Sequence, residues 1–444
     1  MAKTFKLGGI HPHDNKLSRA VAIEQFPIPT TVTVMMGQHI GAPAVAKVTK
    51  GDKVLVGDLL GAAAGFVSAN IHSPVSGTVT SVDLAVDGGG LRKNAVTIAV
   101  EGDEWNPAID LSDSLVKDFN LTPAEIIEKI TQAGIVGMGG ATFPTQVKLS
   151  VPAGKKAEVL IVNGVECEPY LTADHRLMLE KGEELLVACR IVMAALGVTR
   201  TYIGIEKNKP DAIDNLSKLI ARGGYDGIEV VALKVMYPQG GEKQLIDAVT
   251  RREVPSGALP VEVGAVVQNV STMYAIYQAV QKNRPLVDRV VTVTGKSVDR
   301  PSNYLVRLGT PISSLIEAAG AMPEGDAKII NGGPMMGRAM ANIESPVTKG
   351  TSGILVIGSK KATRPKAGVC ISCAKCVGVC PMGLEPYLLY KMAKVALFEQ
   401  LEGERVTDCI ECGSCSFTCP ARLPLLDYIR LGKTETMKII RSRK

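Results

Sequence analysis

The chain has 444 residues, of which 46% are hydrophobic, 21% are charged and 4% are aromatic, and its formal net charge is +6. So small a positive excess, with so few aromatic side chains, argues against a nucleic-acid-binding surface. No uninterrupted apolar stretch reaches the ~18 residues needed to span a bilayer, and the first residues contain no apolar signal-peptide core. We therefore expect a folded protein of roughly three domains without a transmembrane segment.

The first hundred residues are rich in strand formers and glycine. Strands are predicted around 30–34, 45–54, 71–79 and 95–100. The phrases KVTKGDKVLVGDLLG and SPVSGTV resemble the barrel-sandwich hybrid fold of lipoyl and biotinyl carriers. Those carriers need a lysine at a hairpin tip, and no lysine occurs between Val54 and Arg92. We therefore expect a scaffold or docking domain, and we interpret His11 and His13 as part of a turn instead of a metal site.

After Trp105 the pattern changes to alternating helices and strands, which predicts a layered α/β domain. Thr122 and Glu125 form a capping box at the start of a helix that ends at Gly134. The glycine-rich segment 134–145 follows. Its backbone N–H groups could hold a phosphate, and by pattern alone a tight structural turn is an equally good interpretation.

Three polar turns follow strands of this domain. The strand 158–162 leads into Asn163, Glu166 and Glu168, and later strands lead into the segments 237–243 and 266–272. Ligands bind beyond the carboxyl ends of strands in open α/β sheets, so these turns form one plausible ligand rim. A solvated acidic turn is the alternative for Glu166 and Glu168.

From Arg289 the chain becomes rich in strands again. Strands are predicted over 290–295, 304–307 and 327–331, with a short helix from Thr310 to Ala319. This arrangement resembles the soluble-ligand-binding β-grasp (SLBB) module. We interpret Met335 and Met336, which follow the last strand, as packing residues.

Eight cysteines near the end fall in two copies of C-x2-C-x2-C-x3-C-P. In this ferredoxin-type run the fourth cysteine ligates the other [4Fe–4S] cluster. The pattern assigns Cys370, Cys373, Cys376 and Cys419 to a first cluster, and Cys409, Cys412, Cys415 and Cys380 to a second. Zinc and disulfides are the alternatives, and this spacing fits them poorly. A helix is predicted over 384–401, and a basic, solvated tail over 433–444.

At this point a family resemblance becomes specific. The segments GMGGATFPTQVK, NGVECEP, YPQGGE and VQNVST resemble, in order, the flavin-binding motifs of the FMN subunit of respiratory complex I. The whole chain, from GGIHPHDNK to the double ferredoxin motif, resembles the RnfC family of the ion-translocating Rnf electron transport complex. It departs from the complex I pattern at Met138, where that family has arginine, and at Gly241 and Glu242, where it has two acidic residues.

The resemblance implies a set of flavin and nucleotide contacts. The loop 137–140 and Lys148 would hold the FMN phosphate, Asn269 and Thr272 would close over it, and the acidic turn and the second glycine turn would face FMN or NADH. Glu166 and Glu168 are the implied catalytic residues. The implied cofactor-binding residues are Gly137, Gly139, Gly140, Phe143, Lys148, Asn163, Glu166, Glu168, Tyr237, Gly240, Gly241, Glu242, Asn269 and Thr272.

Together these observations predict a multidomain α/β protein. It has a barrel-sandwich hybrid domain (1–104), a complex I-like FMN- and NADH-binding domain (105–286), a β-grasp domain (287–360), an α-helical double [4Fe–4S] domain (361–431) and a basic tail (432–444).

Because NADH gives two electrons and a cluster takes one, FMN is the converter that this inventory needs. The resemblance implies an oxidoreductase subunit that exchanges electrons between NAD(H), FMN and two [4Fe–4S] clusters. It would work in a membrane complex coupled to Na+ or H+ translocation, held by partner subunits at the cytoplasmic face and receiving ferredoxin electrons through a partner. Two alternatives are a cobalamin reductase-like protein and a one-electron relay with a vestigial nucleotide site.

Overall fold

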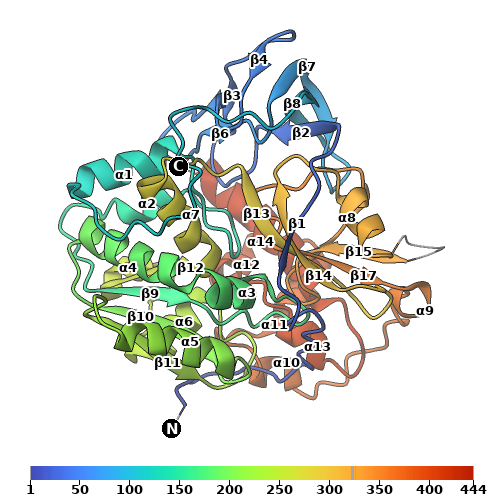
Figure 1. Ribbon diagram of the computed structural model, residues 1–444. Helices are drawn as coiled ribbons and strands as arrows, with labels where there is room; N and C mark the ends of the chain where they lie inside the picture. Colours follow the sequence, from blue (N-terminus) through green and yellow to red (C-terminus); the bar gives the residue numbers. More distant parts are fainter. Residues whose placement is uncertain (1, 322–324, 326, 444) are drawn as a thin grey trace.

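The computed structural model describes residues 2–321, 325 and 327–443. Figure 1 shows four parts in contact: a small β domain at the top, an α/β domain on the left, a β-rich domain on the right and a helical domain behind and below. Each of the four predicted folds is present. Over the described residues, no helix is both long enough and apolar enough to cross a membrane.

The small β domain is built from two sheets with strand orders β2-β8-β7-β4 and β3-β5-β6. Alternate residues of its strands, such as Val32, Val34, Val96 and Ile98, are buried in one core between the sheets. This is the expected barrel-sandwich hybrid. Its strands are β2 (Thr31–Met35), β3 (Val45–Ala46), β4 (Lys53–Val54), β5 (Leu59–Ala62), β6 (Ile71–His72), β7 (Gly77–Val86) and β8 (Arg92–Val100).

The α/β domain has a parallel sheet of order β11-β10-β9-β12 with helices on both faces. Leu160 and Val162 of β9 belong to one apolar core, whereas Val159 and Ile161 belong to the core on the opposite face. A strand buried on both faces is apolar throughout, as this one is. The strands are β9 (Val159–Asn163), β10 (Thr201–Glu206), β11 (Ile228–Leu233) and β12 (Ala265–Asn269).

The first helix of this domain begins where the capping box predicted. Thr122 and Glu125 form the capping box of α1, with both reciprocal hydrogen bonds present. The helices are α1 (Pro123–Gln132), α2 (Thr145–Leu149), α3 (Ala173–Glu180), α4 (Gly182–Leu196), α5 (Pro210–Ala221), α6 (Glu242–Thr250) and α7 (Val270–Gln281), with a 3-10 turn at Pro260–Val263.

The β-grasp domain has a mixed sheet of order β1-β14-β13-β17-β15-β16, with α8 packed on one face. Its first strand, β1, comes from far away in the sequence. The elements are β1 (Ile23–Gln25), β13 (Asp288–Thr294), β14 (Ser302–Arg307), α8 (Ile312–Ala318), β15 (Lys328–Asn331), β16 (Arg338–Ala339), β17 (Gly353–Ile357) and α9 (Ser359–Ala362).

The helical domain differs from prediction in two places. The helix expected over 384–401 is two helices, because Ala396 takes a left-handed conformation (φ 59°) between them. The expected solvated tail continues a long helix instead, so the boundary at 431/432 falls inside α14. The elements are α10 (Lys375–Gly378), α11 (Pro386–Lys394), α12 (Gln400–Gly403), the 3-10 turn Val406–Asp408, α13 (Ser414–Thr418) and α14 (Leu425–Ser442).

Packing explains why the basic tail is helical. Gly432 is buried, and a Cβ at this position would lie 2.6 Å from the side chain of Leu401. Thr436 is fully buried, and its hydroxyl donates to the carbonyl of Phe398 at 2.8 Å. Arg430 and Lys433 of α14 also pack inward, since both pair with Glu411, and charge content alone did not reveal this buried side.

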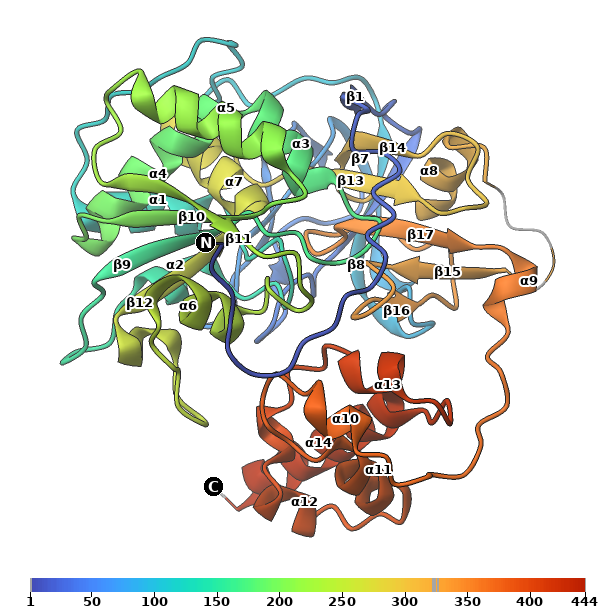
Figure 2. The same cartoon turned by 90° about the horizontal axis from the view of Figure 1, so that it is seen from below.

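Residues 3–25, which we call the N-terminal strap, lie outside the small β domain to which we assigned them. Lys3 forms a bridge to Leu233, the N–H of Gly9 donates to Val379 of the helical domain, and β1 pairs with β14. Figure 2 shows the strap, in dark blue, passing from the α/β domain over the helical domain to the β-grasp sheet. The strap therefore connects three domains.

Lys349 of the β-grasp domain is a buried junction of three domains. Its side-chain nitrogen donates to the carbonyls of Asn70 and Gly134, each at 2.7 Å. Burial lowers the pKa of Lys349 to about 7. Burial, and then the charge of Lys349, lower the pKa of His72 to about 3, so this imidazole stays neutral above pH 6.

This junction predicts a pH-dependent stability. Between about pH 7 and the ordinary lysine pKa of about 10.4, the unfolded chain holds a proton at Lys349 that the folded chain lacks. The contribution of Lys349 to the free energy of unfolding therefore rises with pH above about 7, by up to about 1.4 kcal/mol per pH unit. Thermal unfolding of the wild type and of Lys349→Met from pH 6.5 to 9 should show the difference growing in favour of the wild type. A difference that does not vary with pH would contradict this.

Candidate functional site

The carboxyl ends of two adjacent parallel strands form the centre of the candidate flavin site. β9 ends at Asn163 and β12 ends at Asn269, and the two asparagines are register partners. The chain continues from β9 to β10 on one side, whereas β12 lies on the other side. Connections therefore diverge at this point, and open α/β sheets bind ligands in the crevice outside it.

The glycine-rich loop lies against the N-terminus of α7. The N–H of Met138 donates to the hydroxyl of Thr272 at 2.9 Å. A Cβ at Gly139 would lie 2.5 Å from the side-chain nitrogen of Asn269, whereas a Cβ at Gly140 would meet no atom within 4 Å. The loop is thus packed tightly on one side and open on the other.

This arrangement fits the phosphate of FMN. Gly140 is exposed, and Asn269 caps α7 by accepting from the N–H of Ser271 at 2.9 Å. Exposed backbone N–H groups beside the positive end of a helix form an anion site. The predicted contacts Gly137, Gly139, Gly140, Asn269 and Thr272 are therefore close together, and Phe143 closes the loop because its carbonyl accepts from Gly137 at 2.8 Å.

Lys148 and Glu242 form an ion pair at the same sheet edge. The ammonium of Lys148 lies 2.6 Å from a carboxylate oxygen of Glu242 and donates to the carbonyl of Val267 at 3.1 Å. Both side chains are partly exposed, at 30% and 39%. The structure brings together two residues that were predicted separately as ligand contacts, and each partly neutralises the charge of the other.

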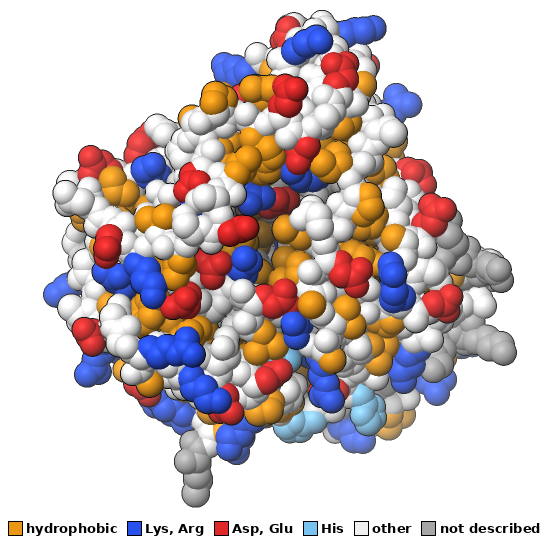
Figure 3. Space-filling view, in the orientation of Figure 1, with side chains coloured by type: hydrophobic (Ala, Val, Ile, Leu, Met, Phe, Trp, Pro, Cys, Tyr) orange, Lys and Arg blue, Asp and Glu red, His pale blue; other side chains and the backbone are white. Residues whose placement is uncertain are grey.

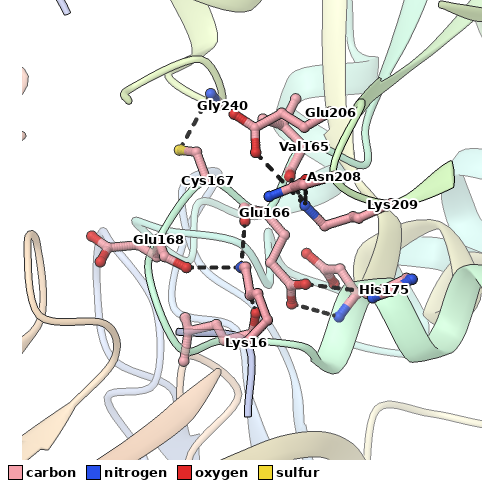
Figure 4. A network of polar contacts seen from close by, with 12 residues as sticks. Lys16, Val165, Glu166, Cys167, Glu168, His175, Glu206, Asn208, Lys209 and Gly240 are labelled. Atoms are coloured by element: carbon pink, nitrogen blue, oxygen red, sulfur yellow. Dashed lines mark hydrogen bonds and ion pairs between the residues drawn. The ribbon is translucent and has the colours of Figure 1, made fainter. Parts of the chain in front are cut away.

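The turn after β9 is held against the second glycine turn (Figure 4). The side-chain amide of Asn163 donates to the carbonyl of Gly240 at 2.8 Å. Figure 4 shows the second contact, in which the N–H of Gly240 donates to the sulfur of Cys167 at 3.4 Å. Gly241 follows as the N-cap of α6. Burial raises the pKa of Cys167 well above its ordinary value, so this thiol stays protonated and is not a nucleophile.

Glu166 binds the start of α3. Its carboxylate accepts from the backbone N–H groups of Asp174 at 2.8 Å and His175 at 3.3 Å, and Glu166 has a left-handed conformation with φ 46°. Burial raises the pKa of Glu166. Glu166 therefore shapes the turn beside the sheet edge, and its carboxylate is hydrogen-bonded to the N–H groups of Asp174 and His175.

Glu168 is directed away from the sheet edge. Its carboxylate accepts from the backbone N–H groups of Met335 at 3.1 Å and Met336 at 2.7 Å, both in the β-grasp domain. A Cβ at Gly333 would lie 2.1 Å from this carboxylate, so only glycine fits there. Glu168 was expected to face FMN or NADH, and in this structure it connects two domains.

Tyr237 connects the α/β domain to the helical domain. Its buried hydroxyl donates to the carbonyl of Cys412 at 2.8 Å, and lies 3.4 Å from a carboxylate oxygen of Glu168. Tyr237, Ile10 and Cys412 form a small apolar cluster of their own. Tyr237 was expected to line the flavin site, and the structure places its hydroxyl against the cysteine loops.

Two residues that hydrogen-bond to the candidate site were missed by the sequence analysis. Lys16 donates three hydrogen bonds to the carbonyls of Glu166, Glu168 and Leu171, at 2.8, 2.9 and 2.6 Å (Figure 4). Asp174 accepts from the side chains of Asn269 and Ser271 at 2.7 and 2.6 Å. Lys16 is the last residue of the segment GGIHPHDNK, and that segment was the one sequence feature that could have pointed to it. No sequence feature pointed to Asp174.

The cysteines of the predicted second cluster line one pocket. Cys380, Cys409, Cys412 and Cys415 surround it together with apolar residues such as Leu389 and Ile429. Backbone N–H groups of Leu384 and Glu411 point at the sulfurs of Cys380 and Cys409, each at 3.4 Å. Burial, and then the neighbouring thiols, raise the pKa of Cys415 to about 12.

The cysteines of the predicted first cluster lie nearer the surface. Cys370, Cys376 and Cys419 are partly exposed and Cys373 is exposed. Burial raises the pKa of Cys376, and the nearby Cys419 thiol raises it further. Within the described ranges, no three His, Cys, Asp or Glu side chains are placed to hold a single metal ion. Thiols spread around a pocket suit a cluster, in which each sulfur binds a different iron, better than one zinc ion.

The second group of cysteines faces the α/β domain. Besides the contact from Tyr237, the side-chain amide of Gln244 donates to the carbonyl of Pro381 at 3.2 Å. By contrast, Val369 and Ile371, which flank Cys370, are 84% and 68% exposed. The two cysteine groups therefore differ in surroundings: one adjoins the flavin domain and the other opens to the surface.

The fold and these sites define a multidomain flavin and iron–sulfur electron-transfer protein, and comparison with known families agrees. Models described as "RnfC Barrel sandwich hybrid domain", "Nuo51 FMN-binding domain", "SLBB domain" and "4Fe-4S dicluster domain" match residues 3–104, 130–278, 290–339 and 369–424. The cofactors that these domains hold are FMN and iron–sulfur clusters. A solved NAD+-reducing [NiFe]-hydrogenase chain shares the fold with a TM-score of 0.51 at 18% identity, over 71% of this chain and 66% of that chain.

Curated relatives identify the family. The C subunit of the proton-translocating ferredoxin:NAD(+) oxidoreductase complex of Clostridium ljungdahlii is 44% identical, over 98% of this chain and 94% of the relative. The corresponding subunit of the Na(+)-translocating complex of Acetobacterium woodii is 43% identical, over 97% of both. The chain therefore belongs to the RnfC family, as its motifs predicted. The cobalamin reductase alternative is not supported.

Proposed function

We propose that this chain exchanges electrons between NAD(H), FMN and two [4Fe–4S] clusters within an ion-translocating ferredoxin:NAD+ oxidoreductase complex. Bound FMN converts the two-electron chemistry of a nicotinamide into single electrons. The observation that carries the proposal is the direct contact between the flavin domain and the cysteine loops, made by Tyr237 and Cys412. Partner subunits attach the chain to the cytoplasmic face of the membrane and translocate Na+ or H+.

Chain residues have distinct tasks in this proposal. The loop 137–140 and the capped start of α7 bind the phosphate, and Lys148 adds a positive charge at the same edge. Asn163 holds the second glycine turn in place through Gly240. The turn of Glu166 and the apolar cluster around Tyr237 exclude water between the flavin domain and the second cluster.

We also propose an order for the clusters. The second cluster, on Cys380, Cys409, Cys412 and Cys415, exchanges electrons with the flavin because its pocket adjoins Tyr237. The first cluster exchanges electrons with a partner protein of the complex. Its loop is exposed at Val369, Ile371 and Cys373. An apolar, exposed rim beside a redox centre is suited to a transient protein contact.

A relay without a nucleotide site is the second candidate function, and one observation favours it. Lys148 and Glu242 pair with each other at 2.6 Å, so neither charge is free to bind a nucleotide in this arrangement. In such a relay the chain would pass single electrons between partners, and NADH would bind elsewhere in the complex.

An anaerobic reduction experiment separates these functions. The full chain is reconstituted with iron, sulfide and FMN, and NADH is added while absorbance is recorded. We expect the flavin band to bleach first and the cluster absorbance to fall afterwards. If dithionite reduces the clusters while NADH changes neither band, the chain by itself is a relay and the proposed NADH site is wrong.

A further inference from the structure

Arg289, near the start of β13, is a buried cation without a carboxylate partner. It is 3% exposed, and its guanidinium donates to the carbonyls of Val290 at 3.3 Å, Met138 at 3.4 Å and Lys349. Among the residues that the structure describes, Arg289 makes no ion pair within 4 Å. Burial lowers its pKa to about 10, so it remains charged at neutral pH. A buried charge normally has a paired counter-charge, and this one has main-chain dipoles instead.

A comparison with Arg307 on the neighbouring strand shows what is unusual. Arg307 is also buried, at 5% exposed, but it pairs with both carboxylate oxygens of Asp103, at 2.8 and 2.9 Å. It therefore serves the junction with the small β domain. Arg289 is as buried, but it donates only to carbonyl oxygens, one of which belongs to Met138 of the α/β domain.

The contact with Met138 places this charge under the glycine loop. Met138 lies between Gly137 and Gly139; its N–H is fixed by Thr272, and its carbonyl accepts from Arg289. The N–H and the carbonyl of Met138 are thus both held by side chains, those of Thr272 and Arg289. A pocket at the junction of α7 and β13 is lined by Met138, Ser271 and Arg289, and Figure 3 shows this face hollowed between the α/β and β-grasp domains.

We propose that Arg289 is a positioning residue for the FMN phosphate, supplied by the β-grasp domain. It draws the carbonyl of Met138 inward, so that the N–H groups of the loop face the phosphate, and it adds a buried positive charge behind them. This inference rests on the proposed function. It makes the flavin site a composite of two domains, with the β-grasp domain contributing to cofactor binding.

A structural alternative is that Arg289 balances the partly buried Asp174, whose charge acts on it. The two roles differ in what they predict for riboflavin, which has the same ring and ribityl chain as FMN but no phosphate. A positioning residue for the phosphate affects FMN alone. A residue that merely stabilises the domain junction affects both ligands equally.

The test is a pair of fluorescence titrations, with FMN and with riboflavin, on the full reconstituted chain. We expect Arg289→Met to weaken FMN binding about tenfold or more, which corresponds to one lost charge-assisted contact. Riboflavin binding should change less than about twofold on the same scale. Arg289→Lys should recover most of the FMN affinity, because it keeps the charge.

Arg307→Met is the matched control, since it removes an equally buried arginine from the other junction. It should lower the unfolding temperature and leave the ratio of the two affinities unchanged. If Arg289→Met does not fold, the double variant Arg289→Gln/Asp174→Asn removes both charges and is titrated instead. Equal weakening of FMN and riboflavin overturns the inference while leaving the proposed function intact. A wild-type chain that binds neither ligand overturns both.

Discussion

Cys380→Ala should remove the second cluster, not the first, although Cys380 is the last cysteine of the first run. Iron content should fall from about eight to about four atoms per chain. NADH should no longer reduce the remaining cluster, whereas dithionite still should, because the pocket of Cys380, Cys409, Cys412 and Cys415 adjoins the flavin domain at Tyr237 and we propose that electrons enter there. Iron analysis and EPR spectra after each reductant measure both effects.

Cys373→Ala is the matched control. Cys373 is exposed and belongs to the first cluster by spacing. This variant should lose a different EPR signal and keep NADH-dependent reduction of the second cluster. Cys409→Ala should lose the same signal as Cys380→Ala. If Cys380→Ala instead loses the signal that Cys373→Ala loses, the fourth cysteine does not cross over and the assignment is wrong.

Lys16→Met should destabilise the turn that carries Glu166 and Glu168. The ammonium supplies three hydrogen bonds to carbonyls of this turn and of Leu171. Each acceptor that loses its donor in a partly buried site costs about 1–3 kcal/mol, so we expect a loss of about 3 kcal/mol or more. Because the same turn holds Gly240, affinity for FMN should fall as well. Urea unfolding and FMN titration measure the two effects.

Lys6→Met provides the control on the same strap. Lys6 is 61% exposed and forms an ion pair with Asp247 at 3.4 Å. Asp247 is only 14% exposed, but it keeps the hydrogen bond from the backbone N–H of Lys6 at 2.9 Å in this variant. Because the ammonium itself is largely solvated, we expect a loss of about 0–1 kcal/mol and unfolding near the wild-type urea concentration. Equal urea midpoints for Lys16→Met and Lys6→Met would show that Lys16 does not stabilise the turn that carries Glu166 and Glu168.

The N-terminal strap gives these predictions a common structural basis. It contacts the helical domain through Gly9 and Val379, the α/β domain through Lys16, and the β-grasp sheet through β1. A Cβ at Gly8 would lie 2.7 Å from the backbone of Cys380, so the strap packs directly on the loop of the second cluster. The strap therefore fixes the position of the cluster loop relative to the flavin turn, and disturbing either end should affect electron exchange between them.

The order of the four folds and the family were predicted correctly from residue patterns alone. Local patterns carried this information: the capping box of Thr122 and Glu125, the apolar strand of β9 and the spacing of eight cysteines. Such features depend on residues a few positions apart, and backbone geometry allows only a few local structures for each spacing. They also located the loop 137–140 and the asparagines at the ends of β9 and β12.

The tertiary structure decided the roles of single residues within that frame. Glu168 was expected at the cofactor, and its carboxylate accepts from the N–H groups of Met335 and Met336, more than 160 positions away. Lys16 and Arg289 reach the flavin domain from the strap and from the β-grasp domain. Residues 432–442, which were expected to form a solvated tail, are the end of α14, and Gly432 and Thr436 of this segment are buried. Each of these depends on contacts between distant segments, which have no periodicity or spacing in the sequence, and the packing of the domains alone determines them.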